Sequence, residues 1–175
     1  MRFDIVEFDE SRDSLDELTL LLNNAYGRLA NMGLDYVAAT QDAKTTANRI
    51  RWATTCWVVR DSRNLLATIC FYARIRFATE PEWYHRKEVC HFGQFAVEPA
   101  LQGSGIGSAL LEIAETRART EGKKELSCDT AFGATHLTAF YEKRGFRRVG
   151  QHRWPHANYD SCVLSKSLLS AHEKP

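Results

Sequence analysis

Three glycines at alternate positions form the segment of this sequence best suited to chemistry. Gly103, Gly105 and Gly107 follow an apolar run that ends at Val97, and they open a helical pattern over 104–120. Without Cβ atoms the backbone can bend tightly, and a bulky anion can approach the main chain. The first N–H groups of a helix lack internal acceptors and lie at the positive end of its dipole. The segment therefore predicts a diphosphate site, although a glycine-rich turn without any ligand has the same composition.

Two other nucleotide-binding motifs do not fit this segment. The dinucleotide fingerprint requires a third glycine three residues after Gly105, where this chain has Ser108. The P-loop requires a lysine directly after its last glycine, and Ser108 follows Gly107. The glycines alone leave the nature of the anion open.

The elements that must position this segment alternate between strand and helix patterns. Ser14 is a predicted N-cap for a first helix that ends near Gly33, and Thr40 is a predicted cap for a second. The expected order is βααβββαβαββ, with strands near 3–8, 55–59, 66–72, 87–97, 124–129, 147–154 and 160–168, and helices near 15–32, 41–52, 104–120 and 136–144. This order predicts an α/β sheet in which the helix at 104–120 makes a right-handed crossover between parallel strands.

Length and composition are those of an ordinary globular domain. The 175 residues fit a single domain over 1–170, with a flexible tail at 171–175. The formal net charge is +1, which disfavours a protein dedicated to nucleic acid or to an anionic membrane. No apolar signal segment or spanning run is present, so we expect a cytoplasmic protein.

Five cysteines are spread through the chain, with no two of them within four residues of each other. This spacing matches neither a zinc site nor a redox pair. Each cysteine lies in or beside an apolar run, which predicts buried reduced thiols in a reducing compartment. We expect no metal centre.

Two blocks of the sequence resemble the GNAT superfamily of N-acetyltransferases. The stretch 95–111 is similar to the family's acetyl-CoA motif, Gln/Arg-x-x-Gly-x-Gly/Ala, with Gln102, Gly105 and Gly107 at the defining positions. The stretch 139–146 is similar to the family's tyrosine-bearing helix and the Gly-Phe turn after it. The resemblance implies a mixed, mostly antiparallel twisted sheet of about seven strands. It also implies a splayed central parallel pair and about four flanking helices.

The resemblance implies direct transfer of an acetyl group from acetyl-CoA, used as a co-substrate, to a primary amine of a small molecule or peptide. Backbone groups of the strand end would pair with the pantetheine arm, and the Val97 N–H would polarise the thioester carbonyl. The backbone amides of residues 102–108, the glycine loop, would hold the pyrophosphate. The implied acetyl-CoA residues are Phe95, Ala96, Val97, Gln102, Gly103, Ser104, Gly105, Ile106, Gly107 and Ser108.

Two residues are implied as catalytic. Tyr141 matches the family's general acid at the CoA sulfur, although a core tyrosine would share its apolar helix face. His91 lies near the point where several members place a base, and histidine titrates in a suitable range. A structural histidine is the alternative, with Glu88 and a water chain from Gln94 as competing bases. Ala134 occupies a position where many members have asparagine, which leaves details of the pantetheine contact open.

Aromatic residues fill the regions where this family builds its acceptor site. We predict substrate contacts from Tyr26, Trp83 and Trp154, although each ring could instead belong to a core or a subunit interface. The last two strands support dimers in many members of the family, so the resemblance leaves open whether this protein forms a homodimer. A non-catalytic acyl-CoA sensor of the same fold is the alternative function. The acceptor itself is not predicted.

Overall fold

The computed structural model describes residues 3–62 and 64–169, so the tail predicted at 171–175 lies outside the described residues. Within those ranges the strands and helices follow the predicted order βααβββαβαββ. The strands are β1 (Asp4–Glu7), β2 (Thr55–Arg60), β3 (Leu65–Tyr72), β4 (Val89–Val97), β5 (Glu125–Ala131), β6 (Arg147–His152) and β7 (Ser161–Ser167). The helices are α1 (Leu15–Ala30), α2 (Ala43–Trp52), α3 (Ile106–Thr120) and α4 (Thr135–Glu142), with 3-10 turns η1 (Val37–Ala39), η2 (Glu82–His85) and η3 (Pro99–Leu101).

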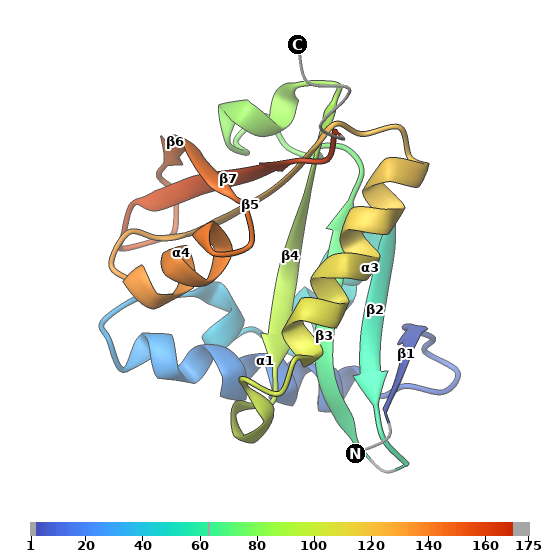
Figure 1. Cartoon of the computed structure of the whole chain (residues 1–175). Coiled ribbons are helices and arrows are strands. Elements are labelled where there is room, and N and C mark those ends of the chain that lie inside the picture. Colours follow the sequence, from blue (N-terminus) through green and yellow to red (C-terminus); the bar gives the residue numbers. More distant parts are fainter. Residues whose placement is uncertain (1–2, 63, 170–175) are drawn as a thin grey trace. The chain divides into compact units, whose positions relative to one another are not determined.

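The seven described strands form a mixed sheet in the order β1-β2-β3-β4-β5-β7-β6 (Figure 1). The pairs β1–β2, β2–β3, β5–β7 and β6–β7 are antiparallel, whereas β4 and β5 are parallel. The parallel register joins Val89–His91 to Glu125–Ser127, and β4 continues beyond it to Val97. The predicted fold class, including the central parallel pair, is confirmed.

The chain divides into two compact units, which are described separately. The first unit contains the residues up to Tyr72 together with Gly93–Ala114, and the second contains Ala73–Phe92 together with the residues from Glu115 onward. β4 and α3 each contribute residues to both units. The glycine loop therefore belongs to the first unit, and both His91 and Tyr141 belong to the second.

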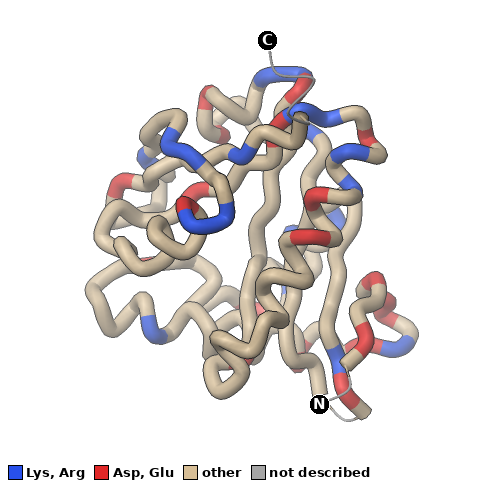
Figure 2. Tube along the Cα trace, in the orientation of Figure 1, with Lys and Arg blue, Asp and Glu red and all other residues tan. Residues whose placement is uncertain are grey.

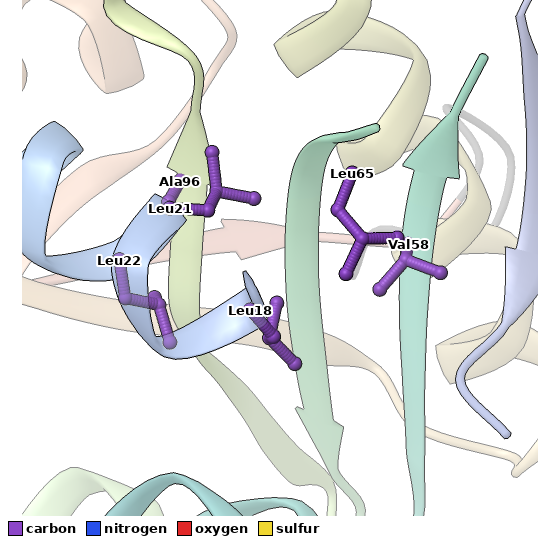
Figure 3. Packing of buried hydrophobic residues seen from close by; sticks show 6 residues of the cluster. All are labelled: Leu18, Leu21, Leu22, Val58, Leu65 and Ala96. Atoms are coloured by element: carbon purple, nitrogen blue, oxygen red, sulfur yellow. The ribbon is translucent and has the colours of Figure 1, made fainter. Parts of the chain in front are cut away.

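The core of the first unit lies between α1 and the strands β2, β3 and β4 (Figure 3). Ser14 caps α1 as predicted, because its side chain accepts from the Glu17 N–H at 3.3 Å. Helical spacing places three buried leucines on one stripe of α1, where they pack on Val58, Leu65 and Ala96. These leucines are Leu18, Leu21 and Leu22.

The start of α2 differs from the sequence prediction. The helix begins at Ala43 rather than near Gln41, and its N-cap is Asp42 rather than Thr40. The Asp42 carboxylate accepts from the Thr45 N–H at 2.8 Å, whereas the Gln41 side chain turns into the buried interior. A carboxylate cap at the helix start prevailed because it satisfies an otherwise unpaired amide.

In the second unit, α4 packs on β5 and β7. The helix ends at Glu142, two residues earlier than predicted, because Gly145 takes φ +87° and the Phe146 N–H bonds back to the Tyr141 carbonyl. The Phe146 side chain is buried and covers this helix end, as predicted. The turn thereby fixes the position of Tyr141 on the last turn of α4.

The predicted burial of the cysteines is confirmed, because all five lie in the described residues as buried free thiols. Burial raises the pKa of the Cys90 thiol to about 12, so this thiol stays protonated at neutral pH. None of the helices described here combines the length and apolar character needed to cross a bilayer.

The buried Asp13 ties the entry of α1 to β2, and we expect Asp13→Asn to destabilise the protein by about 1.5–3 kcal/mol. Its carboxylate contacts Arg12 at 2.7 Å and Arg60 at 2.9 Å. Burial alone would raise the pKa of Asp13, but the hydrogen bonds from Arg12 and from the Asp9 N–H outweigh it and lower the pKa below 3.8.

Because the pKa is lower in the folded state, this stabilisation is present above the unfolded pKa and is lost as the pH falls through the folded pKa. In urea unfolding, the difference in the free energy of unfolding between wild type and variant should therefore stay constant from about pH 7 to about pH 4 and shrink at lower pH. The exposed Glu10→Gln serves as the control. If this difference in the free energy of unfolding did not shrink at low pH, the result would contradict the role assigned to the Asp13 carboxylate.

Candidate functional site

The glycine loop between β4 and α3 has an exposed main chain with room beside it. Gly103 and Gly105 take φ values of +84° and +93°, which residues with a Cβ rarely adopt. A Cβ built on either glycine meets no atom within 4 Å. The loop is therefore an open backbone surface that a side chain at either position would obstruct.

The start of α3 presents main-chain donors next to this surface. The Ala109 N–H donates to the Gly105 carbonyl at 3.1 Å, so the amides of Ile106 and Gly107 precede the first bond of the helix. Such amides have no acceptor within their own helix and lie at its positive end. Residues 99–111 carry no Lys, Arg, Asp or Glu, as the tan loop leading into α3 shows (Figure 2). An anion here would be held by backbone dipoles rather than by side-chain charge.

Gly107 lets α3 approach β4 closely. A Cβ at Gly107 would lie 3.3 Å from Phe95 Cζ and 3.6 Å from Val97 Cγ2. The intervening Ala96 points to the α1 side of the strand, because it packs in the same core cluster as the buried leucines of α1 (Figure 3). The Gln102 side chain donates to the Val97 carbonyl at 3.3 Å and fastens the loop to the strand end. The predicted acetyl-CoA residues of the strand and of the loop are thus neighbours within the first unit.

Gln94 departs from the extended backbone conformation of β4 just before this strand end. It is the one non-glycine residue of the described chain with a positive φ, at +48°, and its side chain is buried. Its Oε1 accepts from Gln41 Nε2 at 2.8 Å, and Gln41 also donates to Thr46 at 2.7 Å. The Gln94 amide therefore serves a polar network inside the first unit, which weighs against the water relay considered for it.

His91 is buried in the second unit, and its environment differs from the one that the sequence suggested. Its ring stacks on Tyr84, with centroids 4.4 Å apart and planes 7° apart. Burial, with a smaller contribution from Lys123, lowers the pKa of His91 to about 3. An ordinary imidazole pKa therefore does not describe this residue, which is neutral at pH 7 and on its own a weak proton acceptor.

An unpredicted carboxylate faces this histidine. Glu80 Oε2 lies 3.5 Å from His91 Nε2, and both side chains are largely buried. No sequence pattern marks Glu80, because it sits in a loop eleven residues before His91 and meets it only through the fold. Glu88, the competing base, is exposed in the turn directly before β4.

Ring stacking and two hydrogen bonds connect His91 to Trp154 through Tyr84 and Asp129. The Tyr84 hydroxyl donates to Asp129 Oδ1 at 3.3 Å, and Trp154 Nε1 donates to Asp129 Oδ2 at 2.8 Å. The structure thus links two predicted site residues through Tyr84 and Asp129. Asp129 could have been noticed in the sequence, because aspartate is uncommon inside a strand and usually needs a partner there.

Tyr141 lies in an aromatic cluster of the second unit and is 7% exposed. Its ring contacts Phe92, Phe140 and Phe146 at centroid distances of 5.9, 5.2 and 5.5 Å. Burial raises the pKa of the Cys128 thiol, and a hydrogen bond with Tyr141 offsets part of that shift. The ring of Tyr141 is therefore held in place by aromatic packing.

The other predicted substrate residues lie in different surroundings. The ring of Tyr26, in the first unit, lies 5.4 Å from the ring of Tyr36 between centroids, and it packs on the core cluster that contains the buried leucines of α1. Trp83, in the second unit, packs on Tyr84 and carries the Arg86 guanidinium 3.8 Å above its ring. Trp83 Nε1 is buried without a hydrogen-bond partner among the described residues. The part of the chain that the structure describes contains no cluster of three or more His, Cys, Asp or Glu residues that could hold a metal ion.

A family model described as "Acetyltransferase (GNAT) family" matches residues 19–146. A curated relative from Bacillus subtilis (strain 168), S-(2-succino)cysteine N-acetyltransferase, is 31% identical over 145 residues, which is 82% of each chain. This match spans the strand end, the glycine loop and the helix of Tyr141.

Solved structures share the fold at low sequence identity. A GNAT-family acetyltransferase from Staphylococcus aureus Mu50 superposes with a TM-score of 0.71 at 16% identity, covering 96% of this chain and 100% of that one. A GNAT-family acetyltransferase from Elizabethkingia anophelis, solved with acetyl-CoA bound, superposes with a TM-score of 0.63 at 15% identity, covering 94% and 97%. At these identities the likeness concerns the fold.

Proposed function

The chain belongs to the GNAT family of acetyltransferases, and from that premise we propose that it transfers an acetyl group from acetyl-CoA to a primary amine by direct attack in a ternary complex. The observation that carries this proposal is the uncharged loop at the start of α3, where open glycine backbone adjoins helix-end amides. That surface suits a diphosphate, and acetyl-CoA supplies both a diphosphate and an activated acyl group.

Acetyl-CoA would be held along β4 and the glycine loop by main-chain groups. The amides from Gln102 to Ser108 hold the pyrophosphate, and the Cβ-free Gly103 and Gly105 leave room for its oxygens. Backbone groups of Phe95, Ala96 and Val97 pair with the pantetheine amides. The Val97 N–H donates to the thioester carbonyl, where negative charge develops during attack. The protein's largest contribution is then to position two substrates for a unimolecular step.

Two side chains move the protons in this proposal. Tyr141 donates its phenolic proton to the departing thiolate, since phenols are protonated at neutral pH. His91 takes the proton that the acceptor's ammonium group must lose before attack. The engagement of Gln94 with Gln41 and the exposed position of Glu88 support His91 over both competitors.

Tyr26, Trp83 and Trp154 are proposed as acceptor contacts, and the first amine to test is S-(2-succino)cysteine. The 31% identical relative is named for that acceptor, whose α-amino group is a primary amine. A panel of amino acids, small aromatic amines and peptide N-termini should be assayed beside it. Release of CoA thiol that depends on one class of amine would identify the acceptor, and no release with any amine would contradict the proposed function.

Acetyl-CoA should stabilise the folded protein. At a concentration about 100 times its dissociation constant, linkage contributes about 2.7 kcal/mol, which corresponds to about 5–10 °C in Tm for a domain of this size. Differential scanning fluorimetry measures the shift. Pantetheine, which lacks the diphosphate, is the matched ligand control and should give a much smaller shift. Equal shifts from both ligands would contradict a site built around the glycine loop.

A further inference from the structure

The loop between β3 and β4 folds around a single buried carboxylate. Glu80 Oε1 accepts hydrogen bonds from the N–H groups of Arg76 at 2.9 Å and Phe77 at 3.1 Å. The Glu80 N–H donates to the Phe77 carbonyl at 3.2 Å, and the Glu80 carbonyl lies 3.2 Å from His85 Nε2. These contacts hold the carboxylate in one orientation without help from a ligand.

The second carboxylate oxygen is directed at His91. Glu80 Oε2 is buried and has no hydrogen-bond partner among the described residues, and it lies 3.5 Å from His91 Nε2. A buried carboxylate oxygen without a partner is costly, so a natural protein that keeps one needs a reason. At 3.5 Å the pair is slightly too long for a hydrogen bond, and catalytic pairs commonly shorten to bonding distance only when substrate binds.

The charged and titratable groups around His91 come from four parts of the second unit. Glu80 faces it from the loop, Tyr84 of η2 covers its ring, and Asp129 of β5 lies behind Tyr84. Lys123 is the nearby cation, and its Nζ donates to the carbonyls of Lys87 and Val89 at 2.7 and 3.3 Å. Burial and Lys123 both disfavour an imidazolium, whereas Glu80 favours one.

We propose that Glu80 is a positioning residue that makes His91 an effective proton acceptor, an inference that rests on the proposed transfer to an amine. The His91 Nε2–H is directed at Glu80 Oε2, which selects the tautomer with its lone pair on Nδ1. Nδ1 takes one proton from the acceptor's ammonium group, the imidazolium pairs with Glu80, and the proton later passes to water. The C–N bond that forms and the C–S bond that breaks are those of the acetyl transfer, so this step moves a proton and no net electrons.

Glu80→Gln tests this role, because glutamine keeps an oxygen for the two backbone donors but removes the charge that stabilises an imidazolium. We expect kcat to fall by about 10²-fold with the acceptor KM unchanged. The acid limb of the kcat/KM profile should move to lower pH, because His91 without the carboxylate binds a proton more weakly. A raised acceptor KM with unchanged kcat would overturn the proposal, since Glu80 would then bind the acceptor directly.

Three further variants separate positioning from general structural damage. Glu82→Gln removes an exposed carboxylate of the same loop and should change neither kcat nor the pH profile. Glu80→Asp keeps the charge and should recover part of the lost rate. His91→Gln combined with Glu80→Gln should be no slower than His91→Gln alone, because the two residues act in one step. If the double variant were slower than His91→Gln by the full factor that Glu80→Gln alone causes, the two residues would act independently and the proposal would be overturned.

A measurement on the wild-type protein without substrate keeps this inference distinct from the proposed function. The ¹⁵N chemical shifts of His91 at about pH 7 should show a neutral ring protonated on Nε2. Protonation on Nδ1 would overturn the role of Glu80 even if acetyl transfer is observed. Conversely, a protein that shows the Nε2–H tautomer but acetylates no amine would contradict the proposed function alone.

Discussion

Gly105→Val should weaken CoA binding by about 10²-fold or more, a loss comparable to one or two charge-assisted hydrogen bonds. The backbone at this position has φ +93°, which a β-branched residue tolerates poorly. The added side chain would also occupy the open space beside the loop. Isothermal titration calorimetry with CoA measures the change directly, and the stabilisation by acetyl-CoA should disappear with it.

Two control variants show whether the loop acts through its main chain. Ser104→Ala removes an exposed hydroxyl but keeps every backbone donor, and its CoA affinity should stay within about threefold of wild type, since a lost hydrogen bond of full strength would cost more. Gly27→Ala adds a Cβ in the middle of α1, where nothing lies within 4 Å, and should leave CoA binding unchanged. Wild-type affinity in a folded Gly105→Val protein would contradict the assigned loop.

Tyr141→Phe should lower kcat by about 10²-fold while the dissociation constant of CoA stays unchanged. The substitution keeps the ring, and hence the contacts with Phe92 and Phe146, but removes the hydroxyl proposed to protonate the leaving thiolate. Steady-state kinetics with acetyl-CoA and a saturating amine measure kcat, and calorimetry with CoA measures the affinity.

Tyr72→Phe is the matched control for this experiment. The Tyr72 hydroxyl donates to the Arg49 carbonyl at 3.2 Å, so its removal should cost some stability but no turnover. Unchanged kcat in Tyr141→Phe would assign that tyrosine to the aromatic core, the alternative that its apolar helix face suggests. A comparable loss in both variants would point to general destabilisation.

Most of the fold could be predicted because its signals are local. Leu18, Leu21 and Leu22 repeat at helical spacing, and the β2–β3 hairpin follows from two β-rich runs separated by turn residues. The ends of the helices were predicted less accurately, because neighbouring residues compete to cap the same helix end. Asp42 starts α2 in place of Thr40. The positive φ of Gly145 stops α4 two residues early.

The glycine loop could be found from the sequence for the same reason. The function proposed for this loop depends on consecutive backbone units, and the spacing of the glycines in the sequence marks those units directly. The environment of His91 could not be found in this way. Its low pKa arises from burial and from Lys123, and its partner Glu80 reaches it from a loop with no periodic pattern. Contacts between residues distant in sequence leave no such local signal.

The most direct test of the central claim follows the backbone amides of the glycine loop while CoA is added. In ¹H–¹⁵N correlation spectra, the amides of Gly105 and Gly107 should show the largest shifts, because they donate to the diphosphate. Pantetheine should leave both signals close to their starting positions. If CoA binds, as calorimetry reports independently, while these two amides do not move, the diphosphate lies elsewhere and the site proposed for acetyl-CoA is wrong.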